Sequence, residues 1–227
     1  MKSRSKPTQL KVRETYHHGD LRAALVKAAQ DIIDRDGIEG FSLREAARRA
    51  GVSPGAPGHH FGSVAGLLTE VAAAAYEALD QHLSRLPPTK NPVKHLHAIA
   101  TGYIDFARRW PGRFQLMHSE GLTHWDDPRR LAASLGALGK VIDACAGVHG
   151  IELKSTWDGL KHPILLANFS TIQGLAYAAL EGQLVQALRA AGDQRPELFD
   201  KVLPEILKAQ WPLSMADDVA KPRLRKK

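Results

Sequence analysis

Two short predicted helices around Gly51-Val52-Ser53 carry the arrangement in this sequence best suited to binding another molecule. Glycine permits the tight turn between them, and Ala46, Ala47 and Ala50 are small enough for close helix packing. The exposed amides and dipole at the start of the second helix favour phosphate groups. Such a pair is typical of a helix-turn-helix, whose second helix lies in the major groove of DNA. Any helical bundle can also contain short helices joined by glycine, so spacing alone leaves a structural role open.

A second group of candidate binding residues is mostly aromatic and falls between residues 103 and 177. Three- and four-residue spacings within this group predict that several of its members share helix faces. A pocket lined by aromatic side chains with a few polar groups suits a small apolar ligand, whereas a purely structural aromatic core would show the same pattern. The candidate ligand-binding residues are Tyr103, Phe106, Trp110, Phe114, Met117, His118, Phe169, Gln173 and Tyr177.

Catalytic and metal chemistry find little support in the sequence. The chain has eleven histidines, but no two stand four residues apart as in a helical metal clamp, and Cys145 is the single cysteine. We expect Cys145 to be a small core residue, and a redox-sensing thiol is the alternative. No nucleophile, base and acid stand in a recognisable set, and no glycine-rich phosphate loop follows a strand. We therefore expect neither an enzyme nor a metal or other cofactor.

Hydrophobic periodicity predicts an all-α fold, because apolar residues recur at three- and four-residue spacing and no strand pattern is evident. Pro87-Pro88 and Asn91-Pro92 interrupt this pattern and suggest a boundary between two units. We expect domains over residues 14–76 and 77–215, flanked by end segments 1–13 and 216–227. Beyond a fourth helix from Ser63 to about Leu83, we expect helices at about 93–110, 113–119, 128–148, 160–190 and 196–210.

Local signals predict where the first helices begin and end. Asp20 can cap the first helix, and Gly37 can end it with a left-handed residue. Ser42 and Glu45 have the spacing of a capping box, in which each side chain bonds to the backbone N–H of the other. Ser53 can cap the third helix, with Pro54 at its first position.

The net charge of +7 is concentrated at the two ends of the chain. Five basic residues lie in residues 1–13 and five in residues 221–227, which leaves 21 basic against 24 acidic residues between them. We expect the first segment to be a disordered arm that contacts the DNA backbone, and the last to be a disordered tail that aids solubility. No apolar run approaches membrane-spanning length, so we expect no membrane partner and a cytosolic location.

Five motifs within residues 16–71 form a recognisable set: Tyr16–Arg22, Gly40–Ala47, Gly51–Ser53, His59–Ser63 and Gly66–Leu68. In these motifs the chain resembles the tetracycline-repressor (TetR) family of bacterial regulators. The resemblance implies an all-α homodimer, usually a repressor, in which a three-helix DNA-binding domain precedes a larger helical-bundle domain for ligand binding and dimerisation. It also implies a near-palindromic operator in double-stranded DNA and a small-molecule effector. A weaker likeness, in Ser170–Leu175 and Leu180–Gly182, is to a subgroup with a Trp-x-His-Gly signature.

The resemblance also implies which residues would meet DNA. Ser42 and Arg44 would do so at the start of the second helix, and His59 and His60 would reach backbone or base edges. Four further residues would lie at the start of the recognition helix, and two would belong to the arm before the first helix. These six are Ser53, Pro54, Gly55, Ala56, Tyr16 and His17, and His18 extends the arm.

The chain departs from the family pattern at two positions. Gly58 stands where members usually carry tyrosine, and Val64 stands where they usually carry lysine. Both missing groups normally bind phosphates, and losing two contacts of about 1 kcal/mol each weakens binding about tenfold to thirtyfold. Pro57 and Gly58 are also poor helix formers. We expect the basic arm to compensate. The alternative is a degenerate member that binds a ligand or a partner protein but holds DNA weakly or not at all.

Overall fold

The computed structural model describes residues 18–190, 192 and 198–216. Over these residues the protein is built from α-helices and one short 3-10 turn, which confirms the predicted all-α class. Tyr16, His17 and most of the two basic end segments lie outside the described residues.

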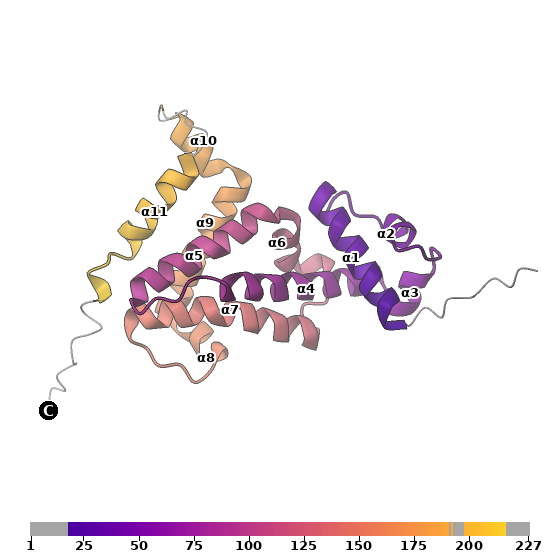
Figure 1. The fold of residues 1–227 in the computed structure, drawn as a ribbon, viewed down its shortest axis with the longest axis horizontal. Helices are drawn as coiled ribbons and strands as arrows, with labels where there is room; N and C mark the ends of the chain where they lie inside the picture. Colours follow the sequence, from indigo (N-terminus) through magenta and orange to yellow (C-terminus); the bar gives the residue numbers. More distant parts are fainter. Residues whose placement is uncertain (1–17, 191, 193–197, 217–227) are drawn as a thin grey trace, which may run out of the picture.

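Three helices form the N-terminal unit: α1 (His18–Asp36), α2 (Leu43–Arg49) and α3 (Ala56–Phe61). They sit together at one end of the molecule, and α4 (Val64–Ser84) runs from beside them into the larger body (Figure 1). Their buried side chains meet the first half of α4 and one residue of the body, Leu116. This smaller core contains Leu25, Ala29, Ile33, Leu67, Leu68, Val71, Ala72 and Leu116.

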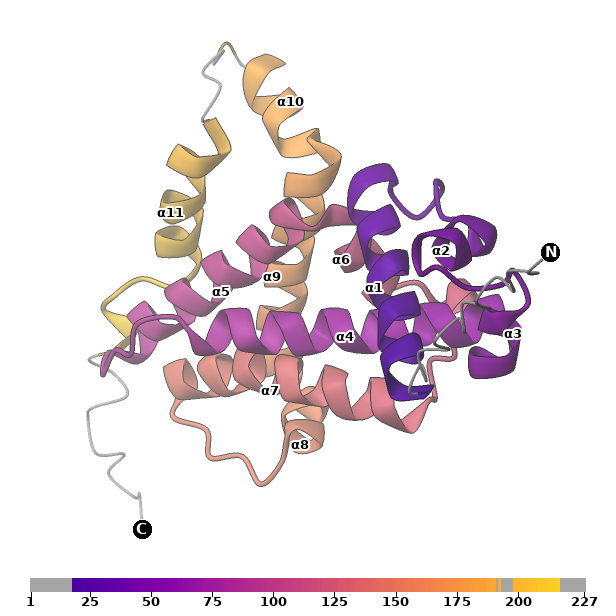
Figure 2. The ribbon, with the colours of Figure 1, turned by 45° about the vertical axis from the view of Figure 1, so that its right-hand side comes forward.

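The second half of α4 belongs to a larger core shared with the later helices. In Figures 1 and 2, α5 and α7 run along α4, while α10 and α11 lie on the side of the body away from α1–α3. Trp211, 1% exposed, follows the last helix and closes this core. The remaining elements are α5 (Pro92–Arg109), α6 (Pro111–Met117), η1 (Glu120–Leu122), α7 (Pro128–His149), α8 (Thr156–Lys161), α9 (Pro163–Glu181), α10 (Gln183–Ala190) and α11 (Leu198–Gln210).

Several helix ends follow the local chemistry of the sequence. Gly37 has a φ of +74° after α1, as predicted, and the Ser63 hydroxyl accepts from the N–H of Gly66 at 2.9 Å to start α4. Two expectations are wrong. Helix α1 begins at His18, so Asp20 lies inside it rather than at its cap. The single helix expected over 160–190 is divided, because Gly182 adopts a φ of +69° between α9 and α10.

Helix α6 connects the two cores. Gly112 lies so close to α1 that an added Cβ would be 2.6 Å from the carbonyl oxygen of Ile33. Next to this contact, the Arg113 Nε donates to Asp34 of α1 at 2.7 Å. Phe114 and Met117, on the same short helix, belong to the larger core. A displacement of α6 within the body would therefore act directly on α1.

A buried carboxylate makes a second connection between the two units. Glu70 of α4 is 8% exposed and accepts from Arg22 of α1 at 2.6 Å. Arg129 at the start of α7 also donates to Glu70, and its other terminal nitrogen lies 3.1 Å from Glu77. Ion pairs therefore join α1, α4 and α7 around one acidic side chain.

Two helices are long and apolar enough, by length and composition, to cross a membrane, contrary to the expectation from the sequence. Half of the α7 window is buried inside the protein, as in a core helix. Only 28% of the apolar window in α9, Pro163–Leu180, is buried. Helix α9 therefore presents an apolar face that no described part of this chain covers.

Candidate nucleic-acid interface and aromatic cluster

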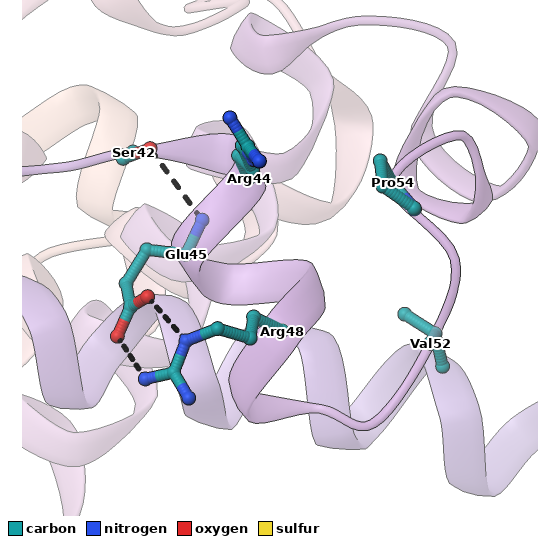
Figure 3. Close-up of a pocket in the computed structure, with 6 residues that line it drawn as sticks. All are labelled: Ser42, Arg44, Glu45, Arg48, Val52 and Pro54. Atoms are coloured by element: carbon teal, nitrogen blue, oxygen red, sulfur yellow. Dashed lines mark hydrogen bonds and ion pairs between the residues drawn. The ribbon is translucent and has the colours of Figure 1, made fainter.

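A groove of about 590 Å³ lies beside α2 and the turn that follows it. The turn depends on Gly51, whose φ is +70°, and the N–H of Val52 donates back to the carbonyl of Ala47 at 3.0 Å. Figure 3 shows side chains from both sides of this turn around the groove. Its lining residues are Ser42, Arg44, Glu45, Arg48, Val52 and Pro54.

Glu45 holds two of the three arginines of α2. Its carboxylate accepts from Arg48 at 2.7 and 2.8 Å and from Arg49 at 2.8 Å. Hydrogen bonds from Arg48 and then Arg49 lower the pKa of Glu45 to about 2. The predicted capping box is therefore only half formed. Glu45 donates its N–H to the Ser42 hydroxyl at a long 3.4 Å, but its carboxylate is bound to the arginines.

Arg44 is the arginine of α2 that remains available. Its side chain is exposed in the first turn of the helix, and in Figure 3 it projects away from the Glu45–Arg48 pair. Within the described residues it makes no hydrogen bond or ion pair. An unpaired guanidinium beside a groove can bind a phosphate or the edge of a guanine.

Helix α3 is shorter than expected and starts later. Its N-cap is Gly55 rather than Ser53, whose carbonyl accepts from Ala56 N–H at 3.0 Å within the preceding turn. Pro54 therefore precedes the helix instead of opening it. Pro57 is in the first turn, where its missing N–H costs no helical hydrogen bond, so the expectation that this proline weakens the helix is wrong. The helix nevertheless contains only six residues.

The predicted DNA-contacting residues with described side chains lie at the surface of this unit. Ser42, Arg44 and His59 are exposed, and His60 is half-buried beside Phe61, with ring centroids 6.4 Å apart. Around α3, Ser53, Pro54 and Gly55 are exposed and Ala56 is half-buried. Sequence reasoning did not include Arg48 and Val52, which also line the groove; their places on either side of the turn were the available signal.

The two departures from the family pattern are also at this surface. Gly58 is exposed, and an added Cβ would meet nothing within 4 Å. Val64, in the first turn of α4, is 44% exposed. Packing therefore does not require a glycine at position 58 or a valine at position 64, and both positions have room at the surface for the tyrosine and lysine of the family pattern.

The structure brings six of the predicted ligand-binding residues into one cluster. Tyr103 and Phe114 are fully buried, with ring centroids 5.4 Å apart, and Phe114 lies 5.5 Å from the ring of Tyr177. His118 lies 4.7 Å from the Phe114 ring, also between centroids. The aromatic cluster consists of Tyr103, Phe114, Met117, His118, Phe169 and Tyr177, with Gln173 half-buried on the same helix as the last two.

Phe106 and Trp110 belong to a separate contact. Their rings are 4.9 Å apart, and both approach His82 of α4, at 6.1 and 6.2 Å. Sequence reasoning also missed two residues next to the aromatic cluster, Tyr76 and Arg130. Tyr76 donates to the carbonyl of Met117 at 3.0 Å, and Arg130 donates to the same oxygen at 2.9 Å. An arginine in the first turn of a helix, where the dipole opposes it, was the only sequence signal for Arg130.

His118 provides a pH-dependent contribution to stability. Its pKa is lowered chiefly by burial and further by nearby Arg130, although the hydrogen bond to Phe114 acts in the opposite direction. Because the pKa of His118 is lower in the folded protein than in the unfolded chain, unfolding takes up a proton at a pH between the two values. The contribution of neutral His118 to stability is therefore fully present above pH 6.5 and is lost as the pH falls through the folded-state pKa. We expect urea unfolding to show a smaller loss of stability between about pH 7.5 and pH 5 in His118→Phe than in wild type. Equal losses would contradict this.

Within the residues described, no group of three or more His, Cys, Asp or Glu side chains is placed to hold a metal ion. Cys145 is fully buried, and burial raises the pKa of its thiol to about 12. The prediction of a core role for Cys145 agrees with this position.

Comparisons with known proteins agree with this geometry. Residues 25–71 match the family model described as bacterial regulatory proteins, tetR family. The HTH-type transcriptional regulator BetI of Vibrio campbellii is 39% identical over 87 residues, a match that spans 36% of this chain and 43% of that regulator. The chain therefore matches less than half the length of this curated relative.

Solved structures resemble the chain over most of its length. A protein of unknown function from Rhodococcus sp. RHA1 is 26% identical, with a TM-score of 0.65 over 87% of this chain and 97% of that one. AibR, solved in complex with isovaleryl coenzyme A and operator DNA, is 18% identical, with a TM-score of 0.56 over 85% of this chain and 98% of that one. The Trp-x-His-Gly subgroup stays a prediction. Residues 25–71 therefore resemble the N-terminal domain of the tetR family of bacterial regulatory proteins, and the whole chain shares the fold of these solved structures.

Proposed function

We propose that this protein is a cytosolic transcriptional regulator, a repressor that binds a near-palindromic DNA operator as a homodimer and is released by a small-molecule effector. The observation that supports DNA binding is the position of Arg44. This arginine is exposed, has no partner among the described residues, and lies beside the groove formed by α2 and the turn that follows it. Exposed Ser42, Ser53 and His59 lie around the same turn. The match of residues 25–71 to the tetR family model and the 87-residue resemblance to BetI support the same conclusion.

Replacing Arg44 tests this proposal. A duplex is first selected from random DNA with the wild-type protein, and its affinity for each variant is then measured by fluorescence anisotropy. We expect Arg44→Ala to weaken binding on the order of tenfold to a hundredfold, because a base- or phosphate-bound arginine contributes about 1–3 kcal/mol. Arg48→Ala is the matched control, since Glu45 already neutralises Arg48, and its effect should be small. If no duplex is selected, the protein is not a sequence-specific regulator.

The second candidate function, a ligand- or protein-binding module with weak DNA binding, is favoured by Gly58 and Val64. Space at Gly58 allows a direct test. We expect Gly58→Tyr to tighten DNA binding about fivefold, because it restores a hydrogen bond of about 1 kcal/mol to phosphate. Gly58→Ala is the control that raises helix propensity without a phenol. Equal affinities of the two variants would show that the tyrosine position makes no phosphate contact here.

Effector control would pass from the aromatic cluster to the N-terminal unit. Helix α4 contributes to both cores, so a shift of α4 would change the separation of the two recognition helices in a dimer. The contact of α6 with α1 through Gly112 offers a parallel route. Operator affinity that is equal with and without a saturating effector would contradict this part of the proposal.

A further inference from the structure

Several polar side chains lie in and beside the aromatic cluster. Three of the four tyrosines of the chain meet there, from α4, α5 and α9. The Tyr103 hydroxyl lies 3.5 Å from the Nε2 atom of His118, and the His118 ring lies 6.4 Å from Tyr76 and 5.9 Å from Tyr177, between centroids. Burial, reinforced by the other two tyrosines, raises the pKa of Tyr103 well above its ordinary value.

Arg130 brings a positive charge to this group. It is 8% exposed, and its Cζ atom lies 5.9 Å from the centroid of the Tyr76 ring. Two of its nitrogens donate to backbone carbonyls, those of Trp125 at 3.1 Å and Met117 at 2.9 Å. These bonds secure the end of α6, which is a structural role. The buried Nε atom has no acceptor among the residues that the structure describes.

No described carboxylate neutralises Arg130. Asp127, three residues before Arg130, accepts from the backbone N–H groups of Arg129 and Arg130, and Glu70 is bound by Arg22 and Arg129. A buried charge without a counter-ion is costly, and an anion placed against it recovers much of that cost. The unpaired charge of Arg130 thus favours an anionic ligand.

His118 does not compete for such an anion as a second cation. Its Nδ1 atom lies 2.8 Å from the carbonyl oxygen of Phe114, so Nδ1 carries the proton and donates. The Nε2 atom is then an acceptor that faces the Tyr103 hydroxyl. Arg130 therefore supplies one cation beside the aromatic cluster, and Tyr103 supplies a hydroxyl held by a single long hydrogen bond.

We propose that the effector is a small organic acid whose carboxylate pairs with Arg130 and whose apolar body packs on the aromatic cluster. This rests on the proposed effector-binding function and names the chemical class that the site takes. When the acid binds, the Tyr103 hydroxyl gives up its long hydrogen bond to His118 and donates to the carboxylate of the acid instead. Phe114 and Tyr177 provide the apolar contact.

The test compares acids with neutral molecules of nearly the same shape. Phenylacetate and hexanoate are titrated by calorimetry into the full-length protein, each beside its amide, phenylacetamide or hexanamide. We expect at least one acid to bind about tenfold or more tightly than its amide, because a charged hydrogen-bonded pair is lost in the amide. Equal binding of acid and amide, or no binding of either acid at millimolar concentration, overturns the proposal.

Variants assign the preference to Arg130. Arg130→Met should bind acid and amide equally, Arg130→Lys should keep part of the preference, and Tyr103→Phe should reduce it. Arg109→Gln, which removes an exposed arginine stacked on Trp110, is the control and should change nothing. Thermal unfolding identifies any variant that fails to fold, and the wild-type comparison stands without it. An acid preference that survives in folded Arg130→Met overturns the assignment.

These measurements need no DNA, which separates the two proposals. A protein that is released from its operator by neutral molecules, and shows no preference for acids, would retain the proposed function and overturn this inference. A protein that binds acids through Arg130 but selects no duplex would support this inference and overturn the proposed DNA-binding function.

Discussion

Gly174→Trp is expected to give a folded monomer that binds its operator on the order of a hundredfold or more weakly than wild type. Gly174 lies on the uncovered apolar face of α9, and an added Cβ there meets nothing within 4 Å. The substitution should therefore leave the subunit intact and obstruct only a partner packed on this face. The exposed residues of this face are Pro163, Ile164, Leu166, Ala167, Ser170 and Gly174.

The loss of affinity follows from how a dimer reads a near-palindrome. Once one subunit has bound its half-site, the second binds from an effective concentration that can reach millimolar. Separated subunits lose this advantage and each must bind alone. Sedimentation velocity reports the oligomeric state, and a gel shift on the selected duplex reports the affinity.

Gly136→Trp is the matched control for this experiment. Gly136 is an exposed helical glycine of α7 whose added Cβ would also meet open space. Gly136→Trp should leave both the oligomeric state and the DNA affinity unchanged. If Gly174→Trp remains a dimer, the α9 face is not the subunit interface.

The second large effect is expected at the contact of α6 with α1. Gly112→Ala should lower the free energy of unfolding by about 1–3 kcal/mol, because its Cβ would overlap the backbone of Ile33. Gly136→Ala provides a control of opposite sign. Replacing that glycine in open space should raise stability by about 0.5–1 kcal/mol through helix propensity alone. Urea unfolding of both variants measures the difference, and a stabilised Gly112→Ala would contradict the close approach.

The sequence predicted elements best where one residue decides the geometry. Glycine at 37 and at 51 adopts the left-handed conformation expected of it, because other residues are strained there. Gly182 has the same conformation but was read as the interior of a helix, since the apolar pattern continues on both sides of it. The cap predicted at Ser53 was wrong, because the turn before α3 takes up two more residues than expected and Gly55 becomes the N-cap.

The candidate sites likewise differ in how far the sequence could predict them. The groove beside α2 is built from residues close together in sequence, so its position was predictable. The polar group around Arg130 draws on α4, α5, α7 and α9, and no local pattern links Tyr76 to Arg130. The pairing of Glu45 with two arginines was also missed, since a glutamate three residues after a serine equally fits a capping box.

That pairing has a consequence for how the protein searches a genome. Affinity for random DNA depends mainly on the number of cations free to displace counter-ions from phosphates. By occupying Arg48 and Arg49, Glu45 leaves Arg44 as the free arginine of α2. Each molecule would then remain for less time on the vast excess of irrelevant sites, and fewer copies per cell would be needed to keep one operator occupied.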